Sequence, residues 1–467
     1  MSRIFKHSSF SPSLGGSWKG AFSMMREEKL FSAIHIAGTA MAIAFTMVMA
    51  VVYYIKLAPI YPEVNRMRTV YFDGIITMND GEGGGASMTY FGSKAFEEWF
   101  MSSPNIEYCS PTNLAVGRGK YSSECQGFVL AKKGEYMEVI LNWTSADFFK
   151  IYEYDFIEGR PFTKKQVEAR EKVCVISEAL AERLFGKDKE AKGQMVTMEN
   201  GLSVRVTGVV RNGSQLTPDS YADLFLPYTL REDKYEINSP YTGHFSIVAT
   251  VKDTEHLKAL KQELAEIEAR LTNNSSEILG WSTSSVEMEK KHVELGKDME
   301  THPMHTLRRN NGGDWYNKIP NSQLIYHFAG LLFVLLFVPA LNLCGIVAGR
   351  MERRTAEMGI RKTFGARRST LLWQVVTENL VLTSIGGIIG LVISWLAIYG
   401  FRLELLSLFF DSYMMSTAPI VTGEMLFSPL LFVGCFIAVV VLNLLSALLP
   451  AWLSLRKPIV ESMMEKR

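Results

Sequence analysis

Residues 324–349 read LIYHFAGLLFVLLFVPALNLCGIVAG and contain no Asp, Glu, Lys or Arg. The hydrocarbon core of a bilayer is about 30 Å thick and an α-helix rises about 1.5 Å per residue, so roughly 20 apolar residues are needed to cross it. This run therefore predicts a transmembrane helix. Pro339 lies inside the run and is expected to bend the helix, because proline removes one backbone hydrogen bond and clashes with the preceding turn.

Three more apolar runs are long enough to cross a membrane, at residues 31–55, 371–400 and 428–453. The first exceeds the apolar core of a secretory signal, typically about 7 to 15 residues, so it is expected to remain as an anchor. The run at 371–400 carries Gly386, Gly387 and Gly390, which let a neighbouring helix approach closely. In the last run, Pro429 falls in the first turn, where the backbone N–H that proline lacks would have no partner within the helix. The predicted fold class is a membrane protein with four transmembrane α-helices.

Basic residues are distributed unevenly around these spans. The loop at 350–370 is strongly basic, whereas the loop at 401–427 has Arg402 as its one basic residue. Short loops rich in lysine and arginine stay in the cytoplasm. The leader 1–30 and the tail 454–467 are also basic, so both termini are expected in the cytoplasm. Residues 56–323, inserted between the first and second helices, are then expected outside it. The basic residues of the cytoplasmic loop are Arg350, Arg353, Arg354, Arg361, Lys362, Arg367 and Arg368.

The leader has an amphipathic pattern just ahead of the first span. Trp18, Phe22 and Met25 fall on one helical face, which predicts a short helix lying in the cytoplasmic membrane interface. The other interpretation is a basic leader without regular structure.

The overall composition conceals the membrane segments. Hydrophobic residues make up 48% of the 467 residues, and the mean hydropathy is only +0.08, because the polar stretch 56–323 dilutes the apolar ends. The net charge of +1 disfavours a nucleic-acid partner, which needs a concentrated basic surface. Among the five cysteines, Cys109 and Cys125 are the pair that a disulfide would join if this stretch is exported, and free thiols are the alternative.

Residues 56–323 mix strand and helix patterns. Asn200 and Gly201 lie between two alternating runs and predict a hairpin with a type I′ turn, and a second hairpin is expected to turn near Gly134. Helical patterns occur at 93–101, 177–185 and 255–271. Together these elements predict a large α+β extracytoplasmic domain with room for two subdomains.

None of the glycine-rich or histidine-containing segments has the pattern of a catalytic or metal site. The segment 81–85 lacks the GK[ST] ending of a phosphate loop and is interpreted as a flexible loop. His302 and His305 flank a proline that spoils helical ligand geometry, and no third ligand accompanies them. The chain is therefore not expected to be an enzyme or to hold a metal ion.

The stretch after the second span has helical periodicity; residues 350–380 read RMERRTAEMGIRKTFGARRSTLLWQVVTENL. Ala356, Ile360 and Phe364 recur every four residues, beside a row of charged residues at the same spacing. That row is Arg353, Glu357 and Arg361. Gly365 is placed to end this helix. An orientation signal requires only the basic charges, so the apolar stripe favours a helix that docks on a partner.

This loop is similar to the cytoplasmic loop of the FtsX-like permeases of the ABC transporter superfamily. Their pattern R-x-x-E-x-G-I-R-K-x-x-G-A is matched by Arg354, Glu357, Gly359, Ile360, Arg361, Lys362, Gly365 and Ala366. The stretches LNWTSADFFKIYEYDFIEGRPF, VCVISEALAERLFG, GQMVTMENGLSVRVTGVV and DLFLPY resemble the MacB-like periplasmic core domain, and PAWLSLRKPIVESM resembles the usual exit from the last helix. The resemblance covers most of residues 20–467.

The resemblance implies a permease subunit of the bacterial inner membrane that pairs with a second copy or a related permease. One copy of the unit is present and no Walker motif, so ATP is expected to be used by a separate cytoplasmic ATPase and no cofactor by the chain itself. In MacB-like members the ATPase moves the outer domain. By this resemblance the loop helix, with Arg353, Glu357, Ile360 and Arg361, docks on the ATPase. Membrane lipids and a periplasmic adaptor or outer-membrane channel are further implied partners.

Two functions are consistent with this resemblance. The first is export or extraction of a substrate such as an antibiotic, a peptide or a lipoprotein. The second is regulation without transport, in which the same architecture activates a cell-wall hydrolase or senses an antimicrobial peptide.

Glu378 lies about two turns into the third span, where the family often has an acidic residue. An ionised carboxylate near the centre of a bilayer costs on the order of several kcal/mol. The side chain is therefore expected to face the helix bundle or to reach a basic loop residue such as Arg367 or Arg368.

Overall fold

The computed structural model describes the chain in segments. These are residues 25–26, 28–79, 86–114, 125–131, 134–231, 241–273, 291–294, 359–407, 420–426 and 428–456, with individual positions between 320 and 351. The chain divides into two compact units. The helical unit comprises Met1–Val52, Ile325–Arg402 and Leu426–Arg467, and the sheet unit comprises Tyr53–Leu324 and Leu403–Met425.

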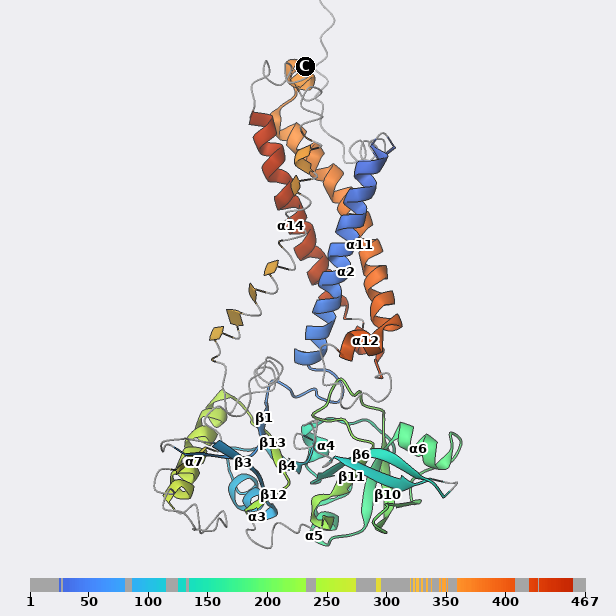
Figure 1. Ribbon diagram of the computed structural model, residues 1–467, viewed down its shortest axis with the longest axis vertical. Coiled ribbons are helices and arrows are strands. Elements are labelled where there is room, and N and C mark those ends of the chain that lie inside the picture. The colour runs from blue at the N-terminus through green and yellow to red at the C-terminus, as the bar shows by residue number, and fades with distance from the viewer. Residues whose placement is uncertain are drawn as a thin grey trace, which may run out of the picture. The chain divides into compact units, whose positions relative to one another are not determined.

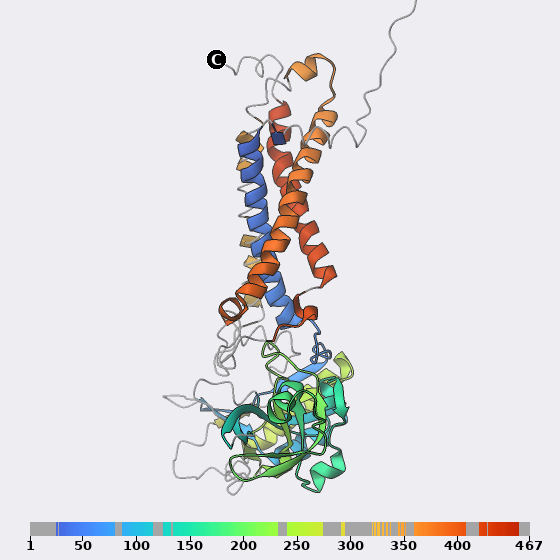
Figure 2. The same ribbon diagram turned by 90° about the vertical axis from the view of Figure 1, so that its right-hand side faces the viewer.

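Three described helices are long and apolar enough to cross a membrane: α2 (Lys29–Leu57), α11 (Arg368–Gly400) and α14 (Pro429–Arg456). Figures 1 and 2 show them side by side. They coincide with three of the four predicted spans, and Pro429 begins α14 as its place in the first turn predicted. The described positions of the remaining span, 324–349, are helical, but most of it lies outside the described residues, so its crossing stays a prediction. Two short helices, α12 (Arg402–Ser407) and α13 (Gly423–Leu426), lie in the chain between α11 and α14.

The close approach predicted at the glycines of α11 is confirmed. A Cβ atom added to Gly386 would lie 2.9 Å from the carbonyl oxygen of Ile36 in α2, and one added to Gly390 would lie 2.6 Å from that of Ala40. A Cβ added to Gly387 would collide with the ring of Phe436 in α14. The absence of side chains at these positions therefore lets α2 and α14 pack directly against α11.

The described residues of the sheet unit contain three β-sheets. Their strands are β1 (Thr69–Phe72), β2 (Ile75–Asn79), β3 (Ala86–Phe91), β4 (Tyr108–Thr112), β5 (Gln126–Leu130), β6 (Tyr136–Thr144), β7 (Phe156–Gly159), β8 (Val173–Ser177), β9 (Met195–Thr197), β10 (Ser203–Val210), β11 (Leu224–Pro227), β12 (Thr242–Gly243), β13 (Ser246–Thr250) and β14 (Lys291–Glu294). The largest sheet has the order β5-β6-β11-β8-β10-β7, with β9 paired to β10, and the others are β1-β13-β4 and β12-β3-β2-β14. Two pairs, β6 with β11 and β8 with β10, are parallel.

Short helices connect the strands, and one long helix packs beside them (Figure 1). They are α3 (Ser93–Ala95), the π-helix η1 (Phe96–Met101), α4 (Phe148–Ile151), α5 (Lys164–Glu168), α6 (Glu178–Phe185), the 3₁₀ helix η3 (Tyr228–Leu230) and α7 (Thr254–Asn273). The three predicted helical stretches of this region are thus confirmed. Ser177 begins α6, because its hydroxyl accepts a hydrogen bond from the Leu180 amide. The unit has the predicted α+β character.

Both predicted hairpins are present, but the first has a different turn. Met198 and Leu202 are hydrogen-bonded through their backbones, so the loop holds Glu199, Asn200 and Gly201. Gly201 has φ +82°, whereas Asn200 is not among the non-glycine residues with positive φ. The predicted type I′ turn is therefore wrong, because it needs positive φ at both central residues. The second hairpin turns at Gly134, with φ +78°, between β5 and β6.

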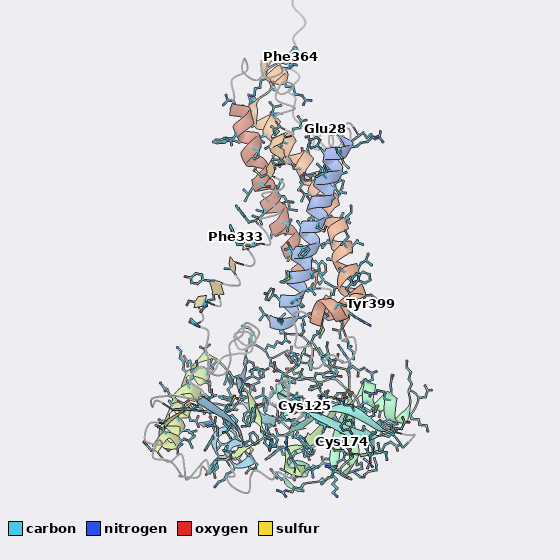
Figure 3. The ribbon with its side chains drawn as sticks, in the orientation of Figure 1. Glu28, Cys125, Cys174, Phe333, Phe364 and Tyr399 are labelled. Atoms are coloured by element: carbon cyan, nitrogen blue, oxygen red, sulfur yellow. The ribbon has the colours of Figure 1, made fainter. Side chains whose placement is uncertain are left out.

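One hydrophobic core extends through the described part of the sheet unit. Cys109, Cys125 and Cys174 are buried in it as free thiols. Of the two alternatives for Cys109 and Cys125, the structure therefore shows free thiols and not a disulfide. Figure 3 labels Cys125 and Cys174. Burial, with a smaller contribution from Asp147, raises the pKa of Cys109 to about 12. These thiols are consequently poor nucleophiles in the folded protein.

Several predicted features lie outside the described residues. They are the leader around Trp18 and Phe22, the glycine segment 81–85, and the pair His302 and His305.

Candidate functional site

The described part of the basic loop ends in a defined helix cap. Gly359 to Thr363 are helical, and Gly365 has φ +89°. The Gly365 amide donates to the Lys362 carbonyl at 3.0 Å, and the Ala366 amide donates to the Arg361 carbonyl at 3.0 Å. This pair of bonds is the Schellman motif, in which glycine adopts the left-handed conformation at little cost. The prediction that Gly365 ends the helix is confirmed.

Large apolar side chains project from this capped helix. Phe364 is 87% exposed and Ile360 is 48% exposed, and Figure 3 labels Phe364 at the loop. Arg361, Arg367 and Arg368 are exposed around them. The result is a compact surface that is both apolar and cationic, held in one conformation by the cap.

Two hydrogen bonds connect this surface to the interior of the helical unit. Nη1 of Arg361 donates to Oε1 of Gln374 at 2.9 Å, and Nε2 of Gln374 donates to Oε1 of Glu378 at 2.9 Å. Glu378 is 2% exposed. The prediction that Glu378 faces the bundle is confirmed, and Gln374 is the residue that links its carboxylate to the loop.

Apolar packing holds the base of the loop against the bundle. Leu371 and Val375 of α11 form a buried cluster with Ala447 and Ala451 of α14, and Ala366 packs against this cluster. Because Ala366 is the residue that closes the helix cap, the loop conformation and the packing of α11 on α14 are connected.

Lys362 has a different environment from the neighbouring arginines. It is half-buried, and this burial, followed by the charge of Arg368, lowers its pKa. An arginine keeps its charge in such surroundings, whereas the charge of a lysine depends more on them.

The structure gathers only part of the predicted docking helix. Gly359, Ile360, Arg361, Lys362, Gly365 and Ala366 lie together at its end, whereas Arg353, Arg354 and Glu357 lie outside the described residues. Sequence reasoning missed Gln374. The signal was present, since Gln374 is a polar residue one helical turn before Glu378 in a predicted membrane span.

Metal chemistry has no candidate in the described part of the chain. No group of three or more His, Cys, Asp or Glu side chains there is arranged to hold an ion.

Two protein families match the chain. Residues 32–267 match the MacB-like periplasmic core domain, and residues 329–459 match the FtsX-like permease C-terminal domain. The chain belongs to the FtsX-like ABC transporter permeases that carry a MacB-like periplasmic core domain.

Individual relatives of this FtsX-like permease are moderately similar. The uncharacterized ABC transporter permease YvrN of Bacillus subtilis is 27% identical over 60% of this chain and 62% of its own length. The uncharacterized ABC transporter permease YknZ of the same organism is 26% identical over 56% of this chain and 57% of its own. The macrolide export ATP-binding/permease protein MacB of Escherichia coli is 24% identical over 66% of this chain and 41% of its own length. The chain thus spans between about two fifths and three fifths of these relatives.

Among solved structures, the periplasmic region of MacB from Actinobacillus actinomycetemcomitans aligns with 48% of this permease and 88% of that chain. The sequence identity is 14% and the TM-score is 0.31.

Proposed function

We propose that this permease is the membrane-spanning subunit of an ABC transporter whose separate ATPase docks on the loop at 350–370. ATP-driven rearrangement of that ATPase then moves the MacB-like domain and exports or extracts a substrate of the antibiotic, peptide or lipoprotein class. The name of the Escherichia coli relative, macrolide export ATP-binding/permease protein, supports the export direction.

The observation that carries the proposal is the exposed apolar and cationic end of the loop helix. A phenylalanine that is 87% exposed on a rigidly capped turn is unfavourable in water and favourable in a groove of a partner protein. The adjacent arginines supply the charge that orients such a partner. The hydrogen bonds from Arg361 through Gln374 to Glu378 give a docked partner a direct connection to α11.

The topology that this function needs follows from the charges. Four spans with the loop at 350–370 inside place both termini in the cytoplasm and residues 56–323 in the periplasm. The chain is then a multi-pass protein of the inner membrane. Exposed apolar side chains of α11 and α14 suit contact with lipid and with a second permease copy; they include Ile388, Val392, Val433, Ile437 and Val441.

Charge reversal at Arg361 tests the docking role. The variant Arg361→Glu loses the bond to Gln374 and opposes the charge of the loop, so co-purification of the ATPase with the full chain should fall by about tenfold or more. Arg402→Glu is the matched control, since Arg402 begins α12 after α11 and lies in the loop expected on the other side of the membrane. Both variants should insert at the wild-type level. Unchanged recovery of the ATPase with Arg361→Glu would contradict the docking role.

A further inference from the structure

A buried ion pair lies directly after the end of α2. Arg66 and Glu63 have side chains that are 2% and 0% exposed, and Nη2 of Arg66 lies 2.7 Å from Oε2 of Glu63. Nη1 of the same guanidinium donates to the carbonyl oxygens of Ile55 and Ala58, each at 2.6 Å. The last carbonyls of a helix have no partner within it and carry its partial negative charge. Arg66 therefore caps α2, whose last turn belongs to the sheet unit.

Glu63 extends this contact into the largest sheet. Its Oε1 accepts a hydrogen bond of 2.8 Å from the hydroxyl of Ser220, which is fully buried. Ser220 lies in the segment 211–223 that joins β10 to β11. The hydroxyl of Tyr154 donates to the Ser220 carbonyl. Burial raises the pKa of Tyr154 well above its usual value, and the nearby Tyr61 and Glu63 raise it further. The phenol therefore keeps its proton and donates this hydrogen bond.

The segment 211–223 is folded tightly on itself. The Thr217 amide donates to the Ser214 carbonyl at 2.9 Å, and the Ser220 amide donates to the Thr217 carbonyl at 3.2 Å. Ser214 and Thr217 are, like Ser220, fully buried. A segment with its polar groups satisfied internally in this way is stiff, so a force applied at one residue reaches the strands on either side.

The same segment also holds the chain between α12 and α13. The Ile420 amide donates to Oε1 of Gln215 at 3.0 Å, and the hydroxyl of Ser214 donates to the Ile420 carbonyl. Ile420 lies in the loop that joins the spans α11 and α14. Within the sheet unit, residues 211–223 thus bond both to Glu63, just after the end of α2, and to the chain at Ile420.

The chemistry of the ion pair favours a mechanical role over a stabilising one. Burying two charges costs desolvation energy, and a buried ion pair is often no more stable than an apolar replacement, although it fixes geometry. A flexible tether would be enough to connect α2 to the domain. Instead, a planar guanidinium with several fixed donors holds the helix end, and Arg suits such a site better than Lys.

We propose that Glu63, Arg66 and the segment 211–223 form the joint through which α2 and the loop after α11 move the MacB-like domain. This joint rests on the proposed function and names the residues that transmit its movement.

The test uses the full chain with its co-purified ATPase in lipid nanodiscs. Hydrogen–deuterium exchange of peptides covering residues 211–227 is measured with and without a non-hydrolysable ATP analogue. One variant replaces both charges, Glu63→Leu with Arg66→Met, so that no unpaired charge is left buried. The second, Ser220→Ala, keeps the ion pair and the helix cap and removes the bond from the Ser220 hydroxyl to Glu63, together with the bond from the same hydroxyl to the Thr217 carbonyl. Arg68→Met is the matched control, because Arg68 pairs with Glu107 at a half-exposed position.

In the wild-type complex and in Arg68→Met, the nucleotide is expected to change exchange in these peptides. In both joint variants that change should shrink by at least about fivefold, the lower end of ordinary coupling between sites. ATPase recovery and ATP hydrolysis should stay at the wild-type level. A wild-type response in both joint variants would overturn the joint alone. Absence of any response in the wild-type complex would overturn the joint together with the proposed function.

Discussion

Gln374 shows at the residue scale how a single amide joins two charged groups. It accepts from Arg361 and donates to the buried Glu378. Replacing Gln374 by Leu removes a donor from a buried carboxylate, which typically costs about 1–3 kcal/mol. We therefore expect Gln374→Leu to lower the thermal unfolding midpoint of the full chain in detergent.

The double variant Gln374→Leu with Glu378→Leu is the control for this prediction. Removing both partners leaves no carboxylate without its donor, and such replacements are often nearly neutral. The midpoint should therefore return toward the wild-type value, as followed by tryptophan fluorescence during heating. A double variant no more stable than the single one would show that the hydrogen bond contributes little.

Prediction from sequence succeeded at residues whose role is local. Gly365 was predicted to end a helix because the pattern around it lies within a few residues, and the structure has the cap there. Gln374 was missed although its partner Glu378 lies one helical turn away. Glu63 and Arg66 were missed because folding, not spacing in the sequence, brings their surroundings together. Glu63, for example, meets Ser220 across more than half of the outer domain sequence, and no spacing rule connects such residues.

At the scale of elements, the glycines of α11 set how closely helices pack. Adding one methyl group at Gly390 would place a Cβ 2.6 Å from a backbone carbonyl of α2, which cannot move as a side chain can. Overpacking of this kind typically costs about 1–3 kcal/mol. Gly390→Ala should therefore lower the thermal unfolding midpoint in detergent.

Gly434→Ala in α14 is the matched control for Gly390→Ala. A Cβ added there meets no atom within 4 Å, and alanine favours a helix interior over glycine by up to about 1 kcal/mol. Its midpoint should stay the same or rise. Equal losses at Gly390 and Gly434 would contradict the close-packing explanation, because only the Cβ added at Gly390 meets a backbone atom.

Element types were more predictable than element partners. Alternating residues and glycine placed both hairpins, and helical periodicity placed α6 and α7, since these signals are local. The turn at Gly201 was predicted wrongly because Asn-Gly also suits a longer loop with one positive φ. The parallel pairs could not be predicted: β6 and β11 align Leu141 with Leu224, and such distant pairing leaves no local pattern.

At the scale of the whole molecule, every functional argument depends on which side of the membrane each unit faces. The buried thiols make this testable with little background. Cys109, Cys125 and Cys174 are all buried, and the pKa of Cys109 is raised to about 12 by burial. Only the thiolate reacts rapidly with maleimides, so these residues should label slowly in the folded chain. Labelling of the native thiols of the sheet unit should therefore be low compared with that of an introduced, exposed cysteine.

Two introduced cysteines then report the topology in spheroplasts treated with a membrane-impermeant maleimide. Ile157→Cys, at a position 53% exposed on β7, should label at once, because the MacB-like domain is expected outside. Phe364→Cys, at a position 87% exposed on the loop, should label only after the membrane is permeabilised. The parent chain, labelled in parallel, measures the background of its own thiols. External labelling of Phe364→Cys would place the loop outside and remove the surface on which an ATPase docks, since ATP is hydrolysed in the cytoplasm.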